Sequence, residues 1–191
     1  MVFLILFLGR LIWRFFLQQV NIGHLRSHGK EIPDVFRGVI DEATLNKMVD
    51  YTYDNSRLEN KENATEDILE LAIIFLLLPV LVAKIAGLQW HLIWQALIFF
   101  GTLSVIGGVV GMLFDIYHTF VLEKKYGFST ITWKLWLTDL VKSVLISAIL
   151  MGVLLSAFMA FILYWPNSWW FWAWVFYTAF EILLLWLFPV V

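Results

Sequence analysis

LIWQALIFFGTLSVIGGVVGMLFD, residues 92–115, is the stretch that decides the class of this protein. It contains no charged side chain before Asp115. A helix needs roughly 20 consecutive apolar residues to cross the hydrocarbon core of a bilayer. A surface helix of a soluble domain would instead carry polar residues along one face. The stretch therefore predicts a helix that spans a membrane.

The composition of the whole chain agrees with a membrane protein. Hydrophobic residues make up 61% of the 191 residues and charged residues 15%, and the mean hydropathy is +0.82. A soluble domain has about 45–50% apolar and about 25% charged residues. The net charge of −2 gives no indication of a nucleic-acid partner. Because there is no cysteine, disulfides and cysteine-type zinc sites are excluded.

Four further apolar stretches predict an all-α polytopic membrane protein. We expect about five transmembrane helices in a single membrane domain, residues 1–191, with the helices at about 2–19, 67–86, 92–115, 143–164 and 168–190. Arg10 and Arg14 interrupt the first stretch, where they share one helical face and can extend towards lipid headgroups. Tryptophans at the start of the fifth stretch, from Trp165 to Trp174, are typical of a membrane interface.

Small residues recur at four-residue spacing in two of the predicted spans. Gly107 and Gly111 form a pair in the third, and every fourth residue from Ala148 to Ala160 is small in the fourth. Small side chains allow helix backbones to approach closely inside a membrane. These faces are therefore expected to pack against other helices, without a chemical role.

Two polar connections, residues 20–66 and 116–142, hold most of the charged residues. In the first, Asp41 is suited to cap a helix over about Glu42–Asn55, which has apolar residues along one side. An amphipathic helix is therefore expected within this loop. Most lysines and arginines also lie in these two loops, so the positive-inside rule places both loops in the cytoplasm and the N-terminus outside. The expected surroundings are a lipid bilayer, either a bacterial inner membrane or the endoplasmic reticulum.

Ionisable side chains in or beside the spans are candidates for a functional role. Asp115 and His118 stand one turn apart at the end of the third span, and Glu181 lies within the fifth. All three are candidates to line a hydrated cavity. For Asp115 and His118, a structural ion pair or hydrogen bond at a helix end is the favoured alternative. A lipid-facing, protonated carboxyl is the alternative for Glu181.

His24 and His28 have the spacing of the two histidine ligands in a zincin helix. Such a site needs a glutamate after the first histidine, and Leu25 occupies that position. No third ligand is evident nearby. We interpret the pair as solvated loop histidines. No other catalytic arrangement is present, so the chain is predicted to contain no catalytic residue and no metal ligand.

The second loop contains the stretch TFVLEKKYGFS, residues 119–129. It resembles the Thr-Phe-Val-Ile-Glu-Glu-Lys-x-Gly-Phe-Asn signature of the CAAX prenyl protease 1 family, which joins the third and fourth helices there. The first loop is similar to that family as well, at Ile32-Pro33, Phe36, Ile40, residues 42–51 and Asp54-Asn55-Ser56. The family usually has a lysine at the position of Asn55. The resemblance covers nearly the whole chain.

That family consists of zinc metalloendopeptidases that trim prenylated proteins. The resemblance implies an N-terminal membrane domain, part of a chamber wall that holds a prenylated or membrane-protein substrate near a catalytic zinc domain. The chain ends abruptly at residues 188–191, so we expect a C-terminal catalytic domain with the zinc motif to follow. This chain would then bind no cofactor and would not be catalytic alone. Glu123, Lys124, Gly127 and Phe128 would contact the catalytic domain.

A stand-alone membrane transporter, channel or scaffold module is the alternative function. Asp115, Glu181 and the glycine-rich third span would then line a pathway. Many transporters contain an internal repeat, and the two halves of this sequence show no convincing one.

Overall fold

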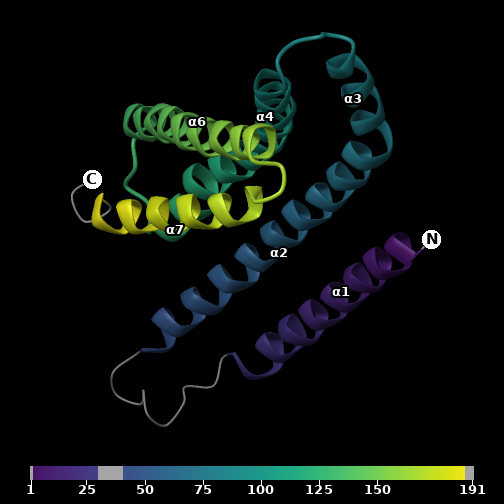
Figure 1. Cartoon of the computed structure of the whole chain (residues 1–191). Helices are drawn as coiled ribbons and strands as arrows, with labels where there is room; N and C mark the ends of the chain where they lie inside the picture. The colour runs from purple at the N-terminus through teal and green to yellow at the C-terminus, as the bar shows by residue number, and fades with distance from the viewer. Residues whose placement is uncertain (1, 30–40, 188–191) are drawn as a thin grey trace. The chain divides into compact units, whose positions relative to one another are not determined.

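The computed structural model describes residues 2–29 and 41–187, and Figure 1 shows their helices. The elements are α1 (Val2–His28), α2 (Glu42–Ala72), the π-helical turn η2 (Ile73–Leu77), α3 (Leu78–Ala86), α4 (Leu92–Tyr117), the π-helical turn η3 (His118–Leu122), α5 (Glu123–Tyr126), α6 (Trp133–Tyr164) and α7 (Trp169–Leu187). No strand occurs in the described residues. Within them, five continuous helices are long and apolar enough to cross a membrane. The predicted all-α class with five spans is confirmed.

The chain divides into two compact units. Unit 1 consists of Met1–Asp67 and Gly111–Thr130, and unit 2 of Ile68–Val110 and Ile131–Val191. That both units belong to one membrane domain stays a prediction. The residues Ile32-Pro33, Phe36 and Ile40, which contributed to the family resemblance, lie outside the described residues.

The helices extend well beyond the apolar stretches that predicted them. The helix expected to end near Asn55 continues through α2, η2 and α3 to Ala86, and the first helix reaches His28 instead of residue 19. A helix satisfies its backbone hydrogen bonds internally, so it forms in water as well as in lipid. Residues 42–78 contain no proline or glycine that would end it. Hydropathy marks the part of a helix that suits lipid, which explains the shorter predicted bounds.

Much of the predicted second loop is helical for the same reason. The third span continues through η3 and α5 to Tyr126, and α6 begins at Trp133 instead of residue 143. Thr132 caps α6, since its side chain accepts a hydrogen bond from the Leu135 backbone N–H at 3.3 Å. Residues 116–142 are therefore two helical extensions joined by a short turn.

The predicted cap at the start of α2 is confirmed. The Thr44 backbone N–H donates to Asp41 Oδ1 at 2.9 Å. Hydrogen bonds from the Thr44 side chain and backbone lower the pKa of Asp41, which stands before the helix and outside any span. The hydrogen bond to Asp41 therefore stabilises the first turn of α2.

In unit 2, α6 and α7 lie side by side as a hairpin (Figure 1). Aromatic rings join them near the turn, where Phe161 meets Phe176 edge-on at 5.8 Å and Trp165 lies 5.9 Å from Trp172. A Cβ added at Gly107 or Gly152 would meet no atom within 4 Å, and the helix packing predicted at these small residues stays a prediction. Aromatic side chains contribute to the α6–α7 contact.

In unit 1, α1 runs antiparallel to α2 (Figure 1). Arg10 donates to Asp67 Oδ1 at 3.1 Å, and Arg14 binds Asp67 Oδ2. Asp67 is only 7% exposed. Further along, the Gln18 amide donates to the Ser56 carbonyl at 3.4 Å. The two arginines that were expected to extend towards headgroups thus bind a buried carboxylate.

Replacing Asp67 with asparagine should loosen the α1–α2 contact, because two guanidinium groups would lose their shared anion. The chain has no cysteine, so a Gln18→Cys, Ser56→Cys pair supplies its only thiols. A short bis-maleimide reagent should cross-link this pair efficiently in the purified protein, and less so with Asp67→Asn added. The exposed Asp139→Asn is the matched control and should leave cross-linking unchanged. Equal cross-linking in all three proteins would contradict the role of Asp67.

Candidate functional site where α2 meets the end of α4

One face of α2 packs along the end of α4, η3 and α5 in unit 1. Leu58 of α2, Leu122 of η3 and Tyr126 of α5 are buried together, and Tyr51 and Phe114 pack against them. At this contact α2 runs antiparallel to the segment formed by the end of α4, η3 and α5, because later residues of α2 meet earlier residues of that segment. This contact brings the second-loop motif, residues 119–129, against α2.

The π-helical turn η3 keeps this contact in register. Phe114, His118, Leu122 and Tyr126 recur every four residues along it. In an α-helix of 3.6 residues per turn, each four-residue step rotates the side chain about 40° further around the axis. A π-helical turn contains more residues per turn and offsets part of that drift. The π-helical segment η3 therefore keeps these four side chains on the side that faces α2 over three consecutive helical turns.

Asp54 of α2 is the polar centre of the contact. It accepts hydrogen bonds from Lys125 Nζ at 2.5 Å and from Tyr126 Oη at 2.7 Å, both on its Oδ2 atom. These hydrogen bonds, first that of Lys125 and then that of Tyr126, lower the pKa of Asp54, which precedes the apolar stretch of its helix. The Lys125 side chain is 60% exposed, whereas Tyr126 is buried. Since exposed ion pairs contribute little, the tyrosine hydroxyl is the more important partner.

Gly127 turns the chain back onto α2 after α5. It has φ 73°, the left-handed conformation that glycine adopts without strain. The Gly127 N–H donates to the Lys124 carbonyl at 3.1 Å, and the Phe128 N–H to the Glu123 carbonyl at 2.9 Å, which is a Schellman motif. The turn places the Phe128 ring edge-on to Tyr51 at 4.9 Å.

Four residues were predicted to contact a catalytic domain. Two of them, Gly127 and Phe128, already make contacts within this chain. Lys47 of α2 also lies 5.3 Å from the Phe128 ring centroid. Phe128 is nevertheless 53% exposed, and Lys124 extends over Phe120 with an exposed side chain. An outward face of the motif therefore remains accessible.

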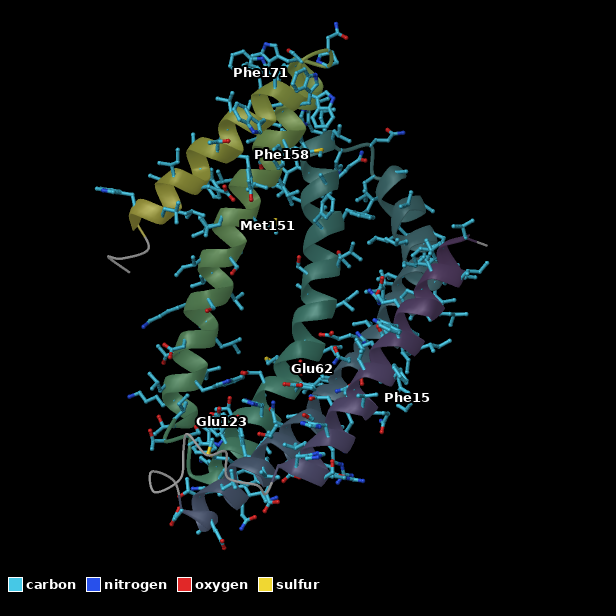
Figure 2. All side chains as sticks on the ribbon, turned by 90° about the horizontal axis from the view of Figure 1, so that it is seen from below. Phe15, Glu62, Glu123, Met151, Phe158 and Phe171 are labelled. Atoms are coloured by element: carbon cyan, nitrogen blue, oxygen red, sulfur yellow. The ribbon has the colours of Figure 1, made fainter. Side chains whose placement is uncertain are left out.

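Ionisable groups gather beside the contact, and Figure 2 labels two of them, Glu62 and Glu123. His118 Nδ1 lies 3.9 Å from Glu123 Oε1. Burial raises the pKa of Glu62, and the nearby charges of Glu66 and Asp115 act in the same direction, while His118 opposes them. The structure thus brings the predicted Asp115 and His118 together with Glu62. The sequence signal for Glu62 is its position four residues after Leu58, on the same face of α2.

Glu181 is not part of this group. It lies on α7 in unit 2, is exposed, and accepts a hydrogen bond from Tyr177 one turn earlier. Asp115 and His118 belong to unit 1. A cavity that contains all three residues stays a prediction.

The residues described here do not suit a catalytic metal site. No group of three histidine, cysteine, aspartate or glutamate side chains among them could hold a metal ion. His24 and His28 are exposed as predicted, but they lie on α1 instead of in a loop, with their rings stacked at 4.6 Å. The helix extends past residue 19, which explains this difference.

Comparisons with known proteins match nearly the whole chain. The model of the family described as CAAX prenyl protease N-terminal, five membrane helices, matches residues 21–191. The chain is 29% identical over 175 residues to CAAX prenyl protease 1 of Saccharomyces cerevisiae, covering 84% of this chain and 38% of that protein. It is 23% identical over 200 residues to the probable CAAX prenyl protease 1 of Schizosaccharomyces pombe, covering 93% of this chain and 40% of that protein.

A solved structure is similar as well. The crystal structure of S. mikatae Ste24p superposes with a TM-score of 0.84 and 26% sequence identity, over 96% of this chain and 44% of that one. The chain therefore spans less than half the length of the relatives that it matches.

Removing the Tyr126 hydroxyl should weaken the contact between α2 and α5. Tyr126→Phe keeps the buried ring and deletes one hydrogen bond to Asp54, at a cost of about 1 kcal/mol in the free energy of unfolding. The measurement is unfolding by SDS in mixed micelles. Tyr164→Phe, an exposed tyrosine near the end of α6, is the control. A loss no larger than that of the control would show that the hydroxyl does not stabilise the fold.

The Asp54 contact should also depend on pH. Because the folded-state pKa of Asp54 is lowered, its stabilising contribution is present above the ordinary aspartate pKa of about 4 and is lost as the pH falls through the lower folded-state value. Asp54→Asn should therefore unfold at a lower temperature than the wild type at pH 7, and the difference should shrink in acid. The exposed Asp50→Asn serves as control at each pH. A difference that is constant with pH would contradict this.

Gly127 offers a test of the turn itself. A Cβ there would meet only Lys47 Nζ, at 3.9 Å, so the cost of Gly127→Ala is conformational, about 1–2 kcal/mol. Gly127→Asn should lose less, since asparagine tolerates the left-handed conformation. Gly107→Ala, in open space within α4, should cost nothing. Thermal unfolding in detergent ranks the three variants, and equal midpoints for all of them would contradict the assignment.

Proposed function

Since the chain belongs to the family of CAAX prenyl protease N-terminal domains with five membrane helices, we propose that it is the membrane part of a zinc metalloendopeptidase of the CAAX-processing type. The chain is an integral membrane protein with five helices of sufficient length among its described residues. The observation that carries the proposal is the family match over residues 21–191, together with a relative that is a CAAX prenyl protease 1.

The zinc chemistry belongs, in this proposal, to a catalytic segment outside these 191 residues. Two facts support this placement. The matched region makes up only 38% of the S. cerevisiae relative, and the described residues here include no set of three metal ligands. This chain would then supply binding and orientation, while the zinc-containing segment supplies the water that cleaves the peptide bond.

The membrane helices would form part of a chamber wall that holds a prenylated peptide or a membrane-protein segment. A prenyl tail is apolar and stays in an apolar environment, while the peptide bond to be cleaved needs water. The wall must therefore be apolar towards lipid and polar where the peptide lies. Glu62, Asp115 and His118 in unit 1 would contribute polar groups, and Glu181 in unit 2 is a further candidate.

The outward face of residues 123–128 would contact the catalytic segment. In unit 1, Asp54 and Tyr51 hold this stretch by its Tyr126 and Phe128 side chains. Lys124 and the exposed part of Phe128 remain available for a partner. We propose that both basic stretches face the cytoplasm, in the endoplasmic reticulum or a bacterial inner membrane, where a catalytic segment would meet them.

A chimera tests the proposal. The matching N-terminal part of the S. cerevisiae CAAX prenyl protease 1 is replaced by this chain, and the purified product is assayed on a prenylated peptide. We expect zinc-dependent cleavage by the chimera, whereas this chain alone should give none. A chimera that is inserted and folded but inactive, beside an active yeast control, would overturn the proposal.

The contact with the catalytic segment is tested in the same chimera. Glu123→Ala and Phe128→Ala should each reduce cleavage without loss of membrane insertion. Lys142→Ala, an exposed residue of α6, is the matched control and should keep full activity. Unchanged activity and folding in both variants would exclude this contact.

A further inference from the structure

We propose that His24 and His28 form a surface site for Zn²⁺ near the C-terminal end of α1. They stand one turn apart on one face of the helix, and both are exposed. Their rings are stacked with centroids 4.6 Å apart and an interplanar angle of 22°. Zinc binds imidazole nitrogen at about 2.0–2.1 Å, so both rings must turn from this stacked arrangement for one nitrogen of each to reach the same ion.

The Ser27 hydroxyl is compatible with the His28 tautomer that metal binding requires. It lies 3.0 Å from the Gly23 carbonyl and 3.2 Å from the His24 carbonyl, and carbonyls only accept hydrogen bonds. When the hydroxyl proton is donated to one of these carbonyls, the Ser27 oxygen can accept a hydrogen bond from His28 Nδ1–H, 2.8 Å away. This tautomer of His28 leaves the Nε2 lone pair available to a metal.

The local charges permit a divalent cation at this position. The last turn of a helix carries a partial negative charge, which attracts cations. Arg26, the cation in that turn, is turned away, because it donates to the Tyr53 hydroxyl and lies over the Tyr53 ring. The positive charge of Arg26 is therefore held at Tyr53, where it does not oppose a cation bound by the two histidines.

The donor set selects the class of ion. Neutral imidazole suits zinc, copper and nickel, whereas calcium and magnesium prefer oxygen ligands. Among the described residues, no third histidine, aspartate or glutamate completes the group, so water would fill the remaining positions. Two protein ligands make an exchangeable site, distinct from the closed site of a structural zinc. It is also separate from the catalytic zinc in the proposed function and does not depend on it.

The experiment is a zinc titration of the full 191-residue chain in detergent, prepared without a polyhistidine tag and read by competition with a fluorescent zinc indicator. We expect one equivalent of Zn²⁺ to bind, and His24→Ala and His28→Ala each to abolish it. His91→Ala is the matched control, since His91 is a single exposed histidine, and should keep full binding. Unchanged binding in the His24 and His28 variants would overturn the site.

Ser27→Ala and copper spectroscopy test the site without removing a ligand. Loss of an outer-shell partner typically weakens metal binding by about 10–100-fold, so Ser27→Ala should bind zinc at least about tenfold more weakly. With Cu²⁺, which binds nitrogen sites more tightly than zinc, electron paramagnetic resonance should show two imidazole nitrogens. A spectrum without nitrogen ligands, or a Ser27→Ala variant with wild-type affinity, would contradict the proposal.

Discussion

A polypeptide inside hydrocarbon finds no water for its backbone N–H and C=O groups, so each group must be satisfied within the chain. The helices of this protein meet that constraint over lengths greater than a bilayer requires. α2, η2 and α3 run without interruption from Glu42 to Ala86, and α4, η3 and α5 from Leu92 to Tyr126. Because the helices do not stop at the membrane surface, their polar extensions can form a structured layer in water.

Polar contacts join the helices of unit 1 beside the apolar cluster of Leu58, Leu122 and Tyr126. Lipid is as apolar as leucine, so within it helices gain little by burying apolar surface against each other. Asp67 joins α1 to α2 through Arg10 and Arg14, and Asp54 joins α2 to α5 through Tyr126. In unit 2 the α6–α7 hairpin depends instead on aromatic rings near its turn.

The motif at residues 119–129 has a structural role within the chain before any role in contacting a partner. Leu122 and Tyr126 are buried against α2, and Gly127 reverses the chain so that Phe128 packs on Tyr51. The π-helical turn η3 maintains this alignment. A motif whose inner side chains are fixed in this way presents its outer side chains in a defined position, which is what a surface for a catalytic segment requires.

The sequence by itself determined the class, the five spans, the cap at Asp41 and the family, because each depends on residues that are adjacent or regularly spaced. It did not determine the helix ends, since hydropathy measures preference for lipid and not helix formation. It also did not pair Arg10 with Asp67, 57 residues apart, or Tyr126 with Asp54, 72 residues apart. Nor did it reveal Glu62 beside His118. Such partners are chosen by the packing of whole helices, and only the tertiary structure decides them.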